Sequence, residues 1–385
     1  MAVLLQKRAP APFQPGPSCV KLVDRQTGGK VRGRNKQRKH GLCKGALPGP
    51  WETGSVGKDQ FGRYRRGRTV RPAAGRRPPP VFAAVDLGTN NCRMLAARPT
   101  SDGFRVVDSF SRTVRLGEGL AATGRLAEQA ISRAVDALAI CADKIRANSA
   151  QGHRVVTTEA CRRAANCREF LRLTQERTGL ELEPISPEEE ARLTLRGCAP
   201  LLDPRFPHAL IFDIGGGSTE LTWVAQSPGE SPRMLAYESF PMGVVNLTEN
   251  YGSGAMTPQA MNALIECVDR RLVDFDANYG IHDAVGQGRV QMVGTSGTVT
   301  TLGALYLGLS RYARSRVDGL DLDFDSVEKL CCHLSGLDHD TRAEMVVMGC
   351  AILEAICRRW PAGRLRIADR GIREGVLHEL IAARN

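Results

Sequence analysis

The sequence predicts an α/β protein of two related domains that share one ligand-binding cleft. Two stretches, residues 82–95 and 210–224, carry this prediction. In each, an apolar run typical of a β-strand ends at an aspartate, passes through glycine and hydroxyl residues, and continues as a second strand-like run. Asp86 and Asp213 occupy the same place in the two stretches. A motif that recurs within one chain implies a repeated structural unit, so we expect each domain to direct one hairpin at the cleft.

The second hairpin has the composition of a phosphate and metal site. Three glycines separate Asp213 from Ser218, Thr219 and Glu220. Glycine lets main-chain N–H groups approach a ligand closely, so these amides and the two hydroxyls form a cradle for an anion. The two carboxylates supply oxygen ligands for a divalent cation. A tight hairpin with a glycine bulge is the alternative, but three glycines bracketed by two acids favour the phosphate interpretation.

A third glycine-rich loop follows the apolar residues Met292 and Val293. Residues 294–301 read Gly-Thr-Ser-Gly-Thr-Val-Thr-Thr and are expected to open a helix, whose N-terminus attracts anions. A small-residue turn that allows close packing explains the same pattern. With the two hairpins, this loop completes the predicted phosphate-binding set, which is Asp86, Gly88, Thr89, Asn90, Gly215, Gly216, Gly217, Ser218, Thr219, Thr295, Ser296 and Gly297.

The first 80 residues differ in composition from the rest of the chain. They contain 19 lysines and arginines and three acids, a net charge of +16, whereas the 385-residue chain carries +12, so the remainder carries −4. Residues 1–80 are rich in proline, glycine and arginine and lack apolar periodicity, so we predict a disordered extension. Its basic clusters, 30–39 and 63–77, suit non-specific contact with a polyanion. A solubilising tail, or sequence upstream of the true start, is the alternative.

Composition also bears on location. No apolar run approaches the roughly 20 residues that span a bilayer, so no membrane contact is expected. The apolar stretch after Met1 is too short for a secretory signal. The 12 cysteines show no Cys-x-x-Cys spacing, which argues against a cysteine metal site or a disulfide framework and favours a reducing cytoplasm.

The first folded domain is expected to begin near Val81. Apolar residues between Leu126 and Ile145 recur at helical spacing and form one stripe. The expected elements after the first hairpin are strands at 104–110, 112–116 and 154–158 and helices at 126–145 and 159–173. Arg162 lies near the start of the last helix, beside Thr157 and Thr158, where its guanidinium would suit a phosphate beyond the strand ends. Solvation is the commoner fate of an arginine on a helix.

Residues 184–192 predict a helix start with one acid that the helix does not need. Ser186 suits the N-cap, Pro187 the first helical position, and Glu189 the third position of a capping box. These roles leave Glu190 unexplained. A carboxylate at a helix start close to phosphate loops could hold a water molecule for attack at phosphorus.

The second domain is expected to follow a linker at residues 204–207. Phe240 to Val245 form another strand-to-glycine passage directed at the cleft, and Thr257-Pro258 begins an amphipathic helix. The remaining expected elements are helices at 324–335 and 342–359, a strand at 367–369, and a final helix that opens at 370–375.

Five motifs, in order, resemble those of the exopolyphosphatase / guanosine pentaphosphate phosphohydrolase family. They are residues 85–90, 187–192, 213–220, 294–298 and 369–377. The resemblance runs from about Val81 to the C-terminus and implies two actin-like (ribonuclease H-like) domains with mixed β-sheets flanked by helices and an active site in the interdomain cleft. By this resemblance, residues 81–203 and 372–385 form the first domain, and residues 204–371 form the second.

The resemblance also implies roles for single residues. It makes Glu190 the catalytic base, brings Arg162 to the terminal phosphates, and assigns Mg²⁺ to Asp213 and Glu220. It further implies a homodimer, and a short form that lacks the C-terminal helical domains of longer members and is less processive on long chains.

The reaction implied is hydrolysis of the terminal phosphoanhydride of inorganic polyphosphate by water that Glu190 activates. Hydrolysis of guanosine pentaphosphate to the tetraphosphate uses the same chemistry and is the alternative. A kinase of the same fold is a rival that Glu190 and the lack of an evident sugar site disfavour. A non-catalytic polyanion-binding protein is a second rival, which the intact Asp213, Glu220 and Glu190 disfavour.

Overall fold

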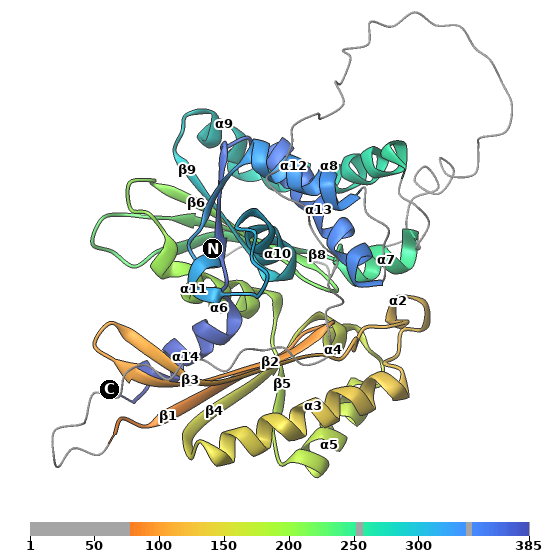
Figure 1. Ribbon diagram of the computed structural model, residues 1–385, viewed down its shortest axis with the longest axis vertical. Helices are drawn as coiled ribbons and strands as arrows, with labels where there is room; N and C mark the ends of the chain where they lie inside the picture. Colours follow the sequence, from red (N-terminus) through yellow and green to blue (C-terminus); the bar gives the residue numbers. More distant parts are fainter. Residues whose placement is uncertain (1–77, 252–256, 336–340, 385) are drawn as a thin grey trace, which may run out of the picture.

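The computed structural model describes residues 78–251, 257–335 and 341–384. Figure 1 shows two β-sheets, one above the other, with helices α6 (Pro187–Cys198) and α14 (Ile372–Ala382) between them. The predicted disorder of residues 1–80 and its basic clusters concern residues 1–77, which lie outside the described residues.

The first sheet has five strands in the order β3-β2-β1-β4-β5. The strands are β1 (Val81–Leu87), β2 (Asn91–Thr100), β3 (Gly103–Thr113), β4 (Ala150–Thr157) and β5 (Leu182–Pro184). The β1–β2 and β2–β3 pairs are antiparallel, and the β1–β4 and β4–β5 pairs are parallel. Two short turns explain the antiparallel half, and helical crossovers explain the parallel half.

The second sheet repeats this arrangement. Its strands are β6 (His208–Ile214), β7 (Thr219–Ala225), β8 (Arg233–Phe240), β9 (Val290–Thr295), β10 (Asp321–Asp323) and β11 (Arg364–Ala368). The order β8-β7-β6-β9-β11 matches that of the first sheet, with the same directions of pairing and with β10 added antiparallel to β11. The predicted α/β fold with two mixed sheets is confirmed.

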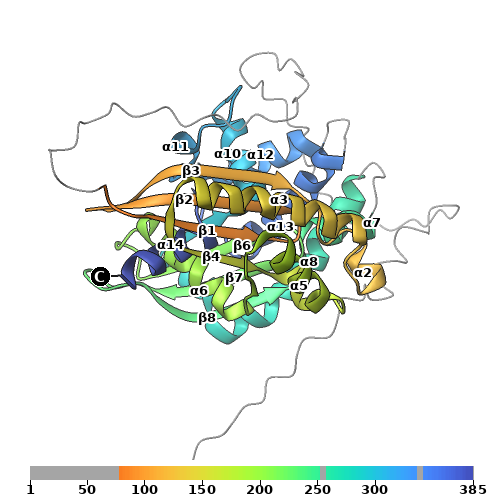
Figure 2. The ribbon, with the colours of Figure 1, turned by 90° about the horizontal axis from the view of Figure 1, so that it is seen from below.

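Helices cover the sheets on their outer faces. The remaining helices are α2 (Leu120–Thr123), α3 (Glu128–Ala147), α4 (Glu159–Arg163), α5 (Cys167–Thr178), η1 (Ala199–Leu201, 3₁₀), α7 (Val244–Tyr251), α8 (Pro258–Tyr279), α9 (Ile281–Gly286), α10 (Ser296–Tyr306), α11 (Arg314–Val317), α12 (Phe324–Ser335) and α13 (Thr341–Arg359). Figures 1 and 2 show α3 and α5 on the side of the first sheet that faces away from the second sheet. The predicted Thr257 cap is confirmed, because its hydroxyl accepts the Ala260 N–H at the start of α8.

The two helices between the sheets cross at glycines. A Cβ at Gly375 of α14 would overlap the carbonyl oxygen of Leu193 in α6, and one at Gly197 of α6 would overlap the carbonyl oxygen of Gly371. Glycine is required at such a crossing because any side chain would separate the backbones. Beyond the crossing, α14 buries Val376 against the first sheet.

One predicted pair of strands is a single strand. Strands were expected at 104–110 and 112–116, but β3 runs from Gly103 to Thr113, because Ser111 stays on the ladder opposite Arg93. Residues after Thr113 leave the sheet, since the N–H groups of Val114 and Arg115 both donate to the Asn90 carbonyl oxygen.

The helix expected over 159–173 is broken into α4 and α5. Ala164 has extended backbone angles, and the Ala165 N–H donates to the Gly124 carbonyl oxygen. The Asn166 side chain accepts from the Leu126 N–H and donates to its carbonyl oxygen. These tertiary hydrogen bonds replace the helical ones at the break.

The start of α6 agrees with the prediction except for half of the capping box. Ser186 is the N-cap, and its hydroxyl accepts the Glu189 N–H at 3.1 Å. Among the described residues, the Glu189 carboxylate does not accept a hydrogen bond from the Ser186 N–H. It pairs instead with Arg154 at 2.6 Å and with Arg192. An ion pair with a guanidinium competes successfully with the reciprocal capping bond.

Two observations concern the whole described part of the chain. None of the helices in residues 78–251, 257–335 and 341–384 combines the length and the apolar character needed to cross a bilayer. The cysteines in these ranges form no disulfide bonds.

Candidate active site

The two predicted hairpins meet at one cavity. In the first, the Gly88 N–H donates to the Asn91 carbonyl oxygen at 2.9 Å; in the second, the Gly215 N–H donates to the Ser218 carbonyl oxygen at the same distance. The turns therefore close in the same way. Each follows a strand that ends near an aspartate, Asp86 on β1 and Asp213 on β6.

Glycine permits the two turns to touch. A Cβ at Gly216 would lie 3.2 Å from Thr89 and from Asn90, and one at Gly217 would lie 2.6 Å from the Thr89 Oγ1. Gly243, in the predicted strand-to-glycine passage, lies directly against the backbone of Gly216 and Gly217. Side chains at these positions would push the turns apart, so the glycines bring two strand ends from different sheets to one point.

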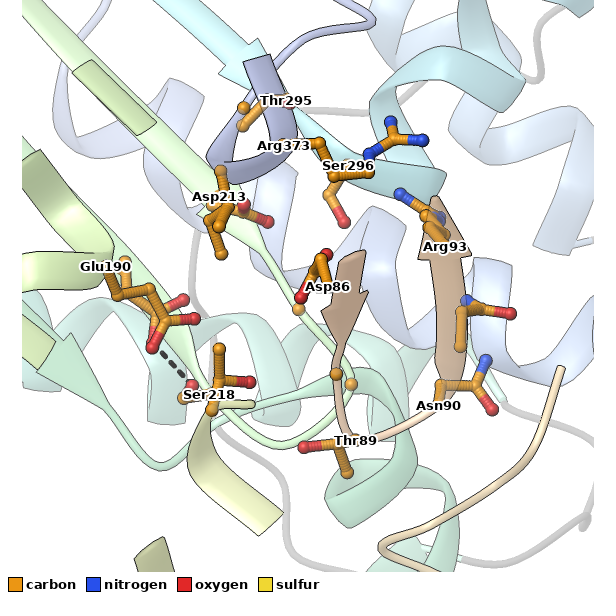
Figure 3. A pocket seen from close by; sticks show the side chains of 18 of the residues that line it. Asp86, Thr89, Asn90, Arg93, Glu190, Asp213, Ser218, Thr295, Ser296 and Arg373 are labelled. Carbon is orange, nitrogen blue, oxygen red and sulfur yellow. Dashed lines mark hydrogen bonds between the residues drawn. The ribbon is translucent and has the colours of Figure 1, made fainter. Parts of the chain in front are cut away.

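Most of the predicted site residues line this cavity. They are Asp86, Gly88, Thr89, Asn90, Glu190, Asp213, Gly215, Gly216, Gly217, Ser218, Glu220, Thr295 and Ser296. Figure 3 shows Asp86 near the middle, Glu190 and Ser218 on one side, and Arg93 and Asn90 on the other.

Three predicted residues lie outside the lining. The Thr219 hydroxyl donates to the Met242 carbonyl oxygen at 2.6 Å, and Gly297 lies within α10, where its carbonyl oxygen accepts from the Thr301 hydroxyl. Arg162 lies behind Glu190 and donates to its carboxylate at 2.8 Å, to the Ile185 carbonyl oxygen, and to Glu159.

Eight residues that sequence reasoning did not assign also line the cavity. They are Asn91, Arg93, Thr158, Asp369, Arg370, Gly371, Ile372 and Arg373. A signal for Arg93 was present in the repeat: β1 pairs Asp86 with Arg93, and β6 pairs Asp213 with Glu220, so Arg93 and Glu220 are equivalent positions. Residues 369–373 belong to the fifth motif of the resemblance, at 369–377, but no role was assigned to them; β11 and the start of α14 bring them to the cavity.

Glu190 is a buried acid with an unusual protonation equilibrium. Glu190 lies in the first turn of α6 and is 7% exposed. Burial, and then the neighbouring Glu220 charge, raise the pKa of Glu190 well above its ordinary value, and Arg162 opposes this rise. A buried carboxyl with a raised pKa in the wall of a cavity is a candidate general base.

The other acids of the cavity also hold protons more tightly than free carboxyls. Burial and the Asp86 charge raise the pKa of Asp213 to about 6, and burial and the Asp213 charge raise the pKa of Glu220 to about 7. Glu220 accepts hydrogen bonds from the hydroxyls of Ser218 and Ser239, which oppose the rise. A cation bound among these buried acids would offset their mutual repulsion.

Two arginines balance these acids. Burial raises the pKa of Asp86, and the charges of Arg373 and Arg93 lower it. Both arginines also lower the pKa of Asp213. Figure 3 shows Arg93 and Arg373 across the cavity from Glu190, so one side is acidic and the other is basic. An anion can bind the arginines while its reacting end faces Glu190.

The acids suit a divalent cation whose remaining ligands come from water and substrate. The Asp86 Oδ1 is buried without a hydrogen-bond partner, which suits an oxygen that ligates a cation. Within the described ranges, no three His, Cys, Asp or Glu side chains already form a coordination group. Mg²⁺ commonly binds one or two protein carboxylates and takes its other ligands from water and substrate phosphate, so the residues fit that ion.

The chain resembles two groups of relatives. A Haemophilus influenzae protein named "Putative exopolyphosphatase" is 28% identical over 305 residues, which cover 78% of this chain and 91% of that protein. An Aliivibrio fischeri guanosine-5'-triphosphate,3'-diphosphate pyrophosphatase is 29% identical over 309 residues, which cover 78% of this chain. The chain spans 59% of the length of the latter protein.

Solved structures agree with the sequence comparison. The crystal structure of the Aquifex aeolicus member of the Ppx/GppA family superimposes with a TM-score of 0.65 at 26% identity, over 80% of this chain and 99% of that one. The pattern of the Ppx/GppA phosphatase family matches residues 95–383. The chain therefore belongs to the Ppx/GppA phosphatase family.

Proposed function

We propose that the chain hydrolyses the terminal phosphoanhydride of inorganic polyphosphate. The observation that carries the proposal is the burial of Glu190, with its pKa well above the ordinary value, in the wall of a cavity that two glycine turns also form. The family supports a phosphatase, and the name of the Haemophilus influenzae relative supports this substrate. A kinase would need an acceptor in place of water, whereas the buried Glu190 carboxyl in the cavity wall supports activation of water.

The residues of the cavity divide the work of hydrolysis. The N–H groups of Gly216 and Gly217 and the Thr89 hydroxyl bind the terminal phosphoryl group. The N–H groups of Gly88 and Gly215 close the turns, and the Ser218 hydroxyl donates to Glu220. Arg93 and Arg373 bind the phosphate oxygens that follow it. Glu190 accepts a proton from water as the water attacks phosphorus, and the shortened polyphosphate leaves.

Asp213 and Glu220 would hold Mg²⁺, with Asp86 as a neighbouring acid. When bound, the ion neutralises charge on the phosphoryl oxygens and on the leaving group. The buried, unpaired Asp86 Oδ1 and the mutual repulsion of the acids support this assignment.

Magnesium binding is expected to depend on pH. In the folded protein, the pKa of Asp213 is about 6 and that of Glu220 about 7, above their unfolded values near 4. The protonated forms of Asp213 and Glu220 are therefore favoured in the folded protein. Their contribution to the free energy of unfolding is fully present below about pH 4 and is lost as the pH rises through about 7. Mg²⁺ needs the deprotonated acids, so saturating MgCl₂ should raise Tm by about 5 °C at about pH 8 and much less at about pH 5.5.

Differential scanning fluorimetry measures this difference. EDTA should reverse the gain, and Asp213→Asn should abolish it. An equal gain in Tm at both pH values would contradict binding by these carboxyls.

Arg162 is proposed as a positioning residue for Glu190. Because its charge lowers the pKa of Glu190, Arg162→Gln should move the acidic limb of the kcat/KM profile upward by about one pH unit. Arg163→Gln is the matched control, since Arg163 contacts Glu159 and lies on the same helix. A pH profile of Arg162→Gln that overlays that of the wild-type protein would remove Arg162 from this role.

Guanosine pentaphosphate is the second candidate substrate. The name of the Aliivibrio fischeri relative supports it, and the same cavity performs the same step. The two are separated by phosphate release from polyphosphate and from guanosine pentaphosphate, side by side, with and without Mg²⁺. Release from polyphosphate with the higher kcat/KM supports the proposal, and turnover of the nucleotide alone refutes it.

Three further features are proposed for the chain as a whole. The net charge of +16 in residues 1–80 supports non-specific contact with polyanions, so deletion of these residues should leave turnover of short substrates intact. The lack of disulfide bonds among the cysteines of the described ranges supports a reducing compartment such as the cytoplasm. The homodimer rests on family resemblance and is tested by sedimentation.

A further inference from the structure

A loop at residues 114–119, the Arg115 loop, packs on the first phosphate-binding turn. The N–H groups of Val114 and Arg115 donate to the Asn90 carbonyl oxygen at 2.8 and 3.0 Å, and the Gly117 N–H donates to the Thr89 carbonyl oxygen at 3.0 Å. A Cβ at Gly117 would overlap the Thr89 methyl group. The loop is therefore fixed to two residues that line the cavity.

The other end of the Arg115 loop reaches the second half of the molecule. The Gly119 N–H donates to the Glu249 carboxylate of α7 at 2.8 Å. Figure 1 shows α2, which follows the loop, facing α7 across the space between the sheets. The loop thus bridges the two halves beside the cavity.

Arg115 has a backbone conformation that side chains disfavour. Its φ is 48°, in the left-handed region, where glycine and asparagine are the residues expected. Its N–H is held by Asn90, and its carbonyl oxygen accepts from Arg133 at 3.4 Å. A strained non-glycine residue that neighbours hold in place beside a functional site is a candidate for function.

The charge of Arg115 is not balanced within its loop. Glu118, the acid of the loop, pairs with Arg133 at 2.7 Å. Arg115 is half-buried, and its guanidinium forms no hydrogen bond or ion pair with the residues that the structure describes. The Arg115 backbone is held on Asn90, which lines the cavity, and a guanidinium without a carboxylate partner suits a phosphate ligand.

We infer that Arg115 binds the phosphate groups that follow the terminal groups of the substrate, at the margin of the cavity. The inference rests on the proposed function, and it adds a subsite outside the cavity. It predicts that Arg115 contributes more to kcat/KM on long-chain polyphosphate than to kcat/KM on tripolyphosphate, because tripolyphosphate ends within or close to the cavity.

The test compares Arg115→Gly, Arg115→Lys and the control Arg105→Ala. Glycine suits the φ of 48°, so Arg115→Gly removes the charge without added strain. Lysine retains the charge and loses the bidentate geometry. Arg105 is exposed near the start of β3, whereas Arg115 follows the end of this strand. Arg105→Ala therefore removes one positive charge from the first domain at a place away from the Arg115 loop.

Steady-state phosphate release at several salt concentrations gives the answer. For Arg115→Gly, the ratio of kcat/KM on long-chain polyphosphate to that on tripolyphosphate should fall about tenfold. The slope of log KM against the logarithm of the salt concentration should decrease by about one, the amount expected for one lost phosphate contact. The Tm of the variant should not fall. Arg115→Lys should recover part of the ratio, and Arg105→Ala should match the wild-type protein.

Two results would overturn the inference: an unchanged ratio for Arg115→Gly, or an equal loss for Arg105→Ala. If the wild-type protein released no phosphate from either compound, the proposed function would fail. Calorimetric titration of wild-type and Arg115→Gly proteins with long-chain polyphosphate would then decide the inference, since weaker binding by the variant supports it and equal binding refutes it.

Discussion

Replacing Glu190 by glutamine is expected to lower kcat about a thousandfold and to leave substrate binding nearly unchanged. General-base catalysis is worth about 10²–10⁴ in rate, and the amide cannot accept the proton of the attacking water. Glutamine keeps the shape of the side chain, and Arg162 keeps its contacts with Glu159 and the Ile185 carbonyl oxygen. Single-turnover phosphate release, together with calorimetric binding of the substrate, measures the two quantities separately.

Glu188→Gln is the matched control for this experiment. Glu188 lies in the same first turn of α6, is exposed, and does not line the cavity. Its substitution should leave kcat within about twofold, as expected of a surface change. Turnover by Glu190→Gln at the wild-type rate would show that another group activates the water.

Replacing Gly375 by alanine is expected to lower the free energy of unfolding by about 3 kcal/mol. The added Cβ would overlap the Leu193 carbonyl oxygen, so α14 and α6 would have to separate. Backbone cannot move aside as the end of a flexible side chain can, and both helices lie in the buried core. Because α6 carries Glu190 and the first turn of α14 carries Arg373, and both residues line the cavity, kcat/KM should fall together with stability.

Urea unfolding monitored by circular dichroism measures the first effect. Gly286→Ala serves as the control, because Gly286 also lies in a helix and a Cβ there would meet no atom within 4 Å. Alanine should be neutral or slightly stabilising at Gly286. A Gly375→Ala protein as stable as the wild type would show that the crossing of the two helices tolerates greater separation.

The hairpins and their contact were predictable because their signals are local. An acid at the end of an apolar run, followed by glycines, marks each turn, and the repeat of that pattern indicates two equivalent sheets. The place of Glu190 at the cavity was predictable for a similar reason, since Ser186, Pro187 and Glu189 were assigned to the helix start and left Glu190 without a structural role.

Tertiary contacts account for what the sequence did not show. The break between α4 and α5 depends on Asn166, whose partner is 40 residues away, and an apolar stripe carries no trace of that bond. The contact of Arg162 with Glu190, which is 28 residues away, was not predicted, because no local pattern encodes it; the predicted contact of Arg162 with phosphate stays a prediction. Residues 369–373 reach the cavity because β11 pairs with β9, a pairing that no local pattern encodes.

The duplicated hairpins differ at one equivalent position, and that difference gives the cavity a polarity. Arg93 stands opposite Asp86, and Glu220 stands opposite Asp213, so one half of the repeat presents a cation where the other presents an acid. A linear phosphate polymer has two chemically identical ends and no intrinsic direction. Under the proposed function, the asymmetry of the cavity supplies a direction: the end of the chain that enters first is expected to face the acidic half, and the arginines are expected to bind the phosphates that follow.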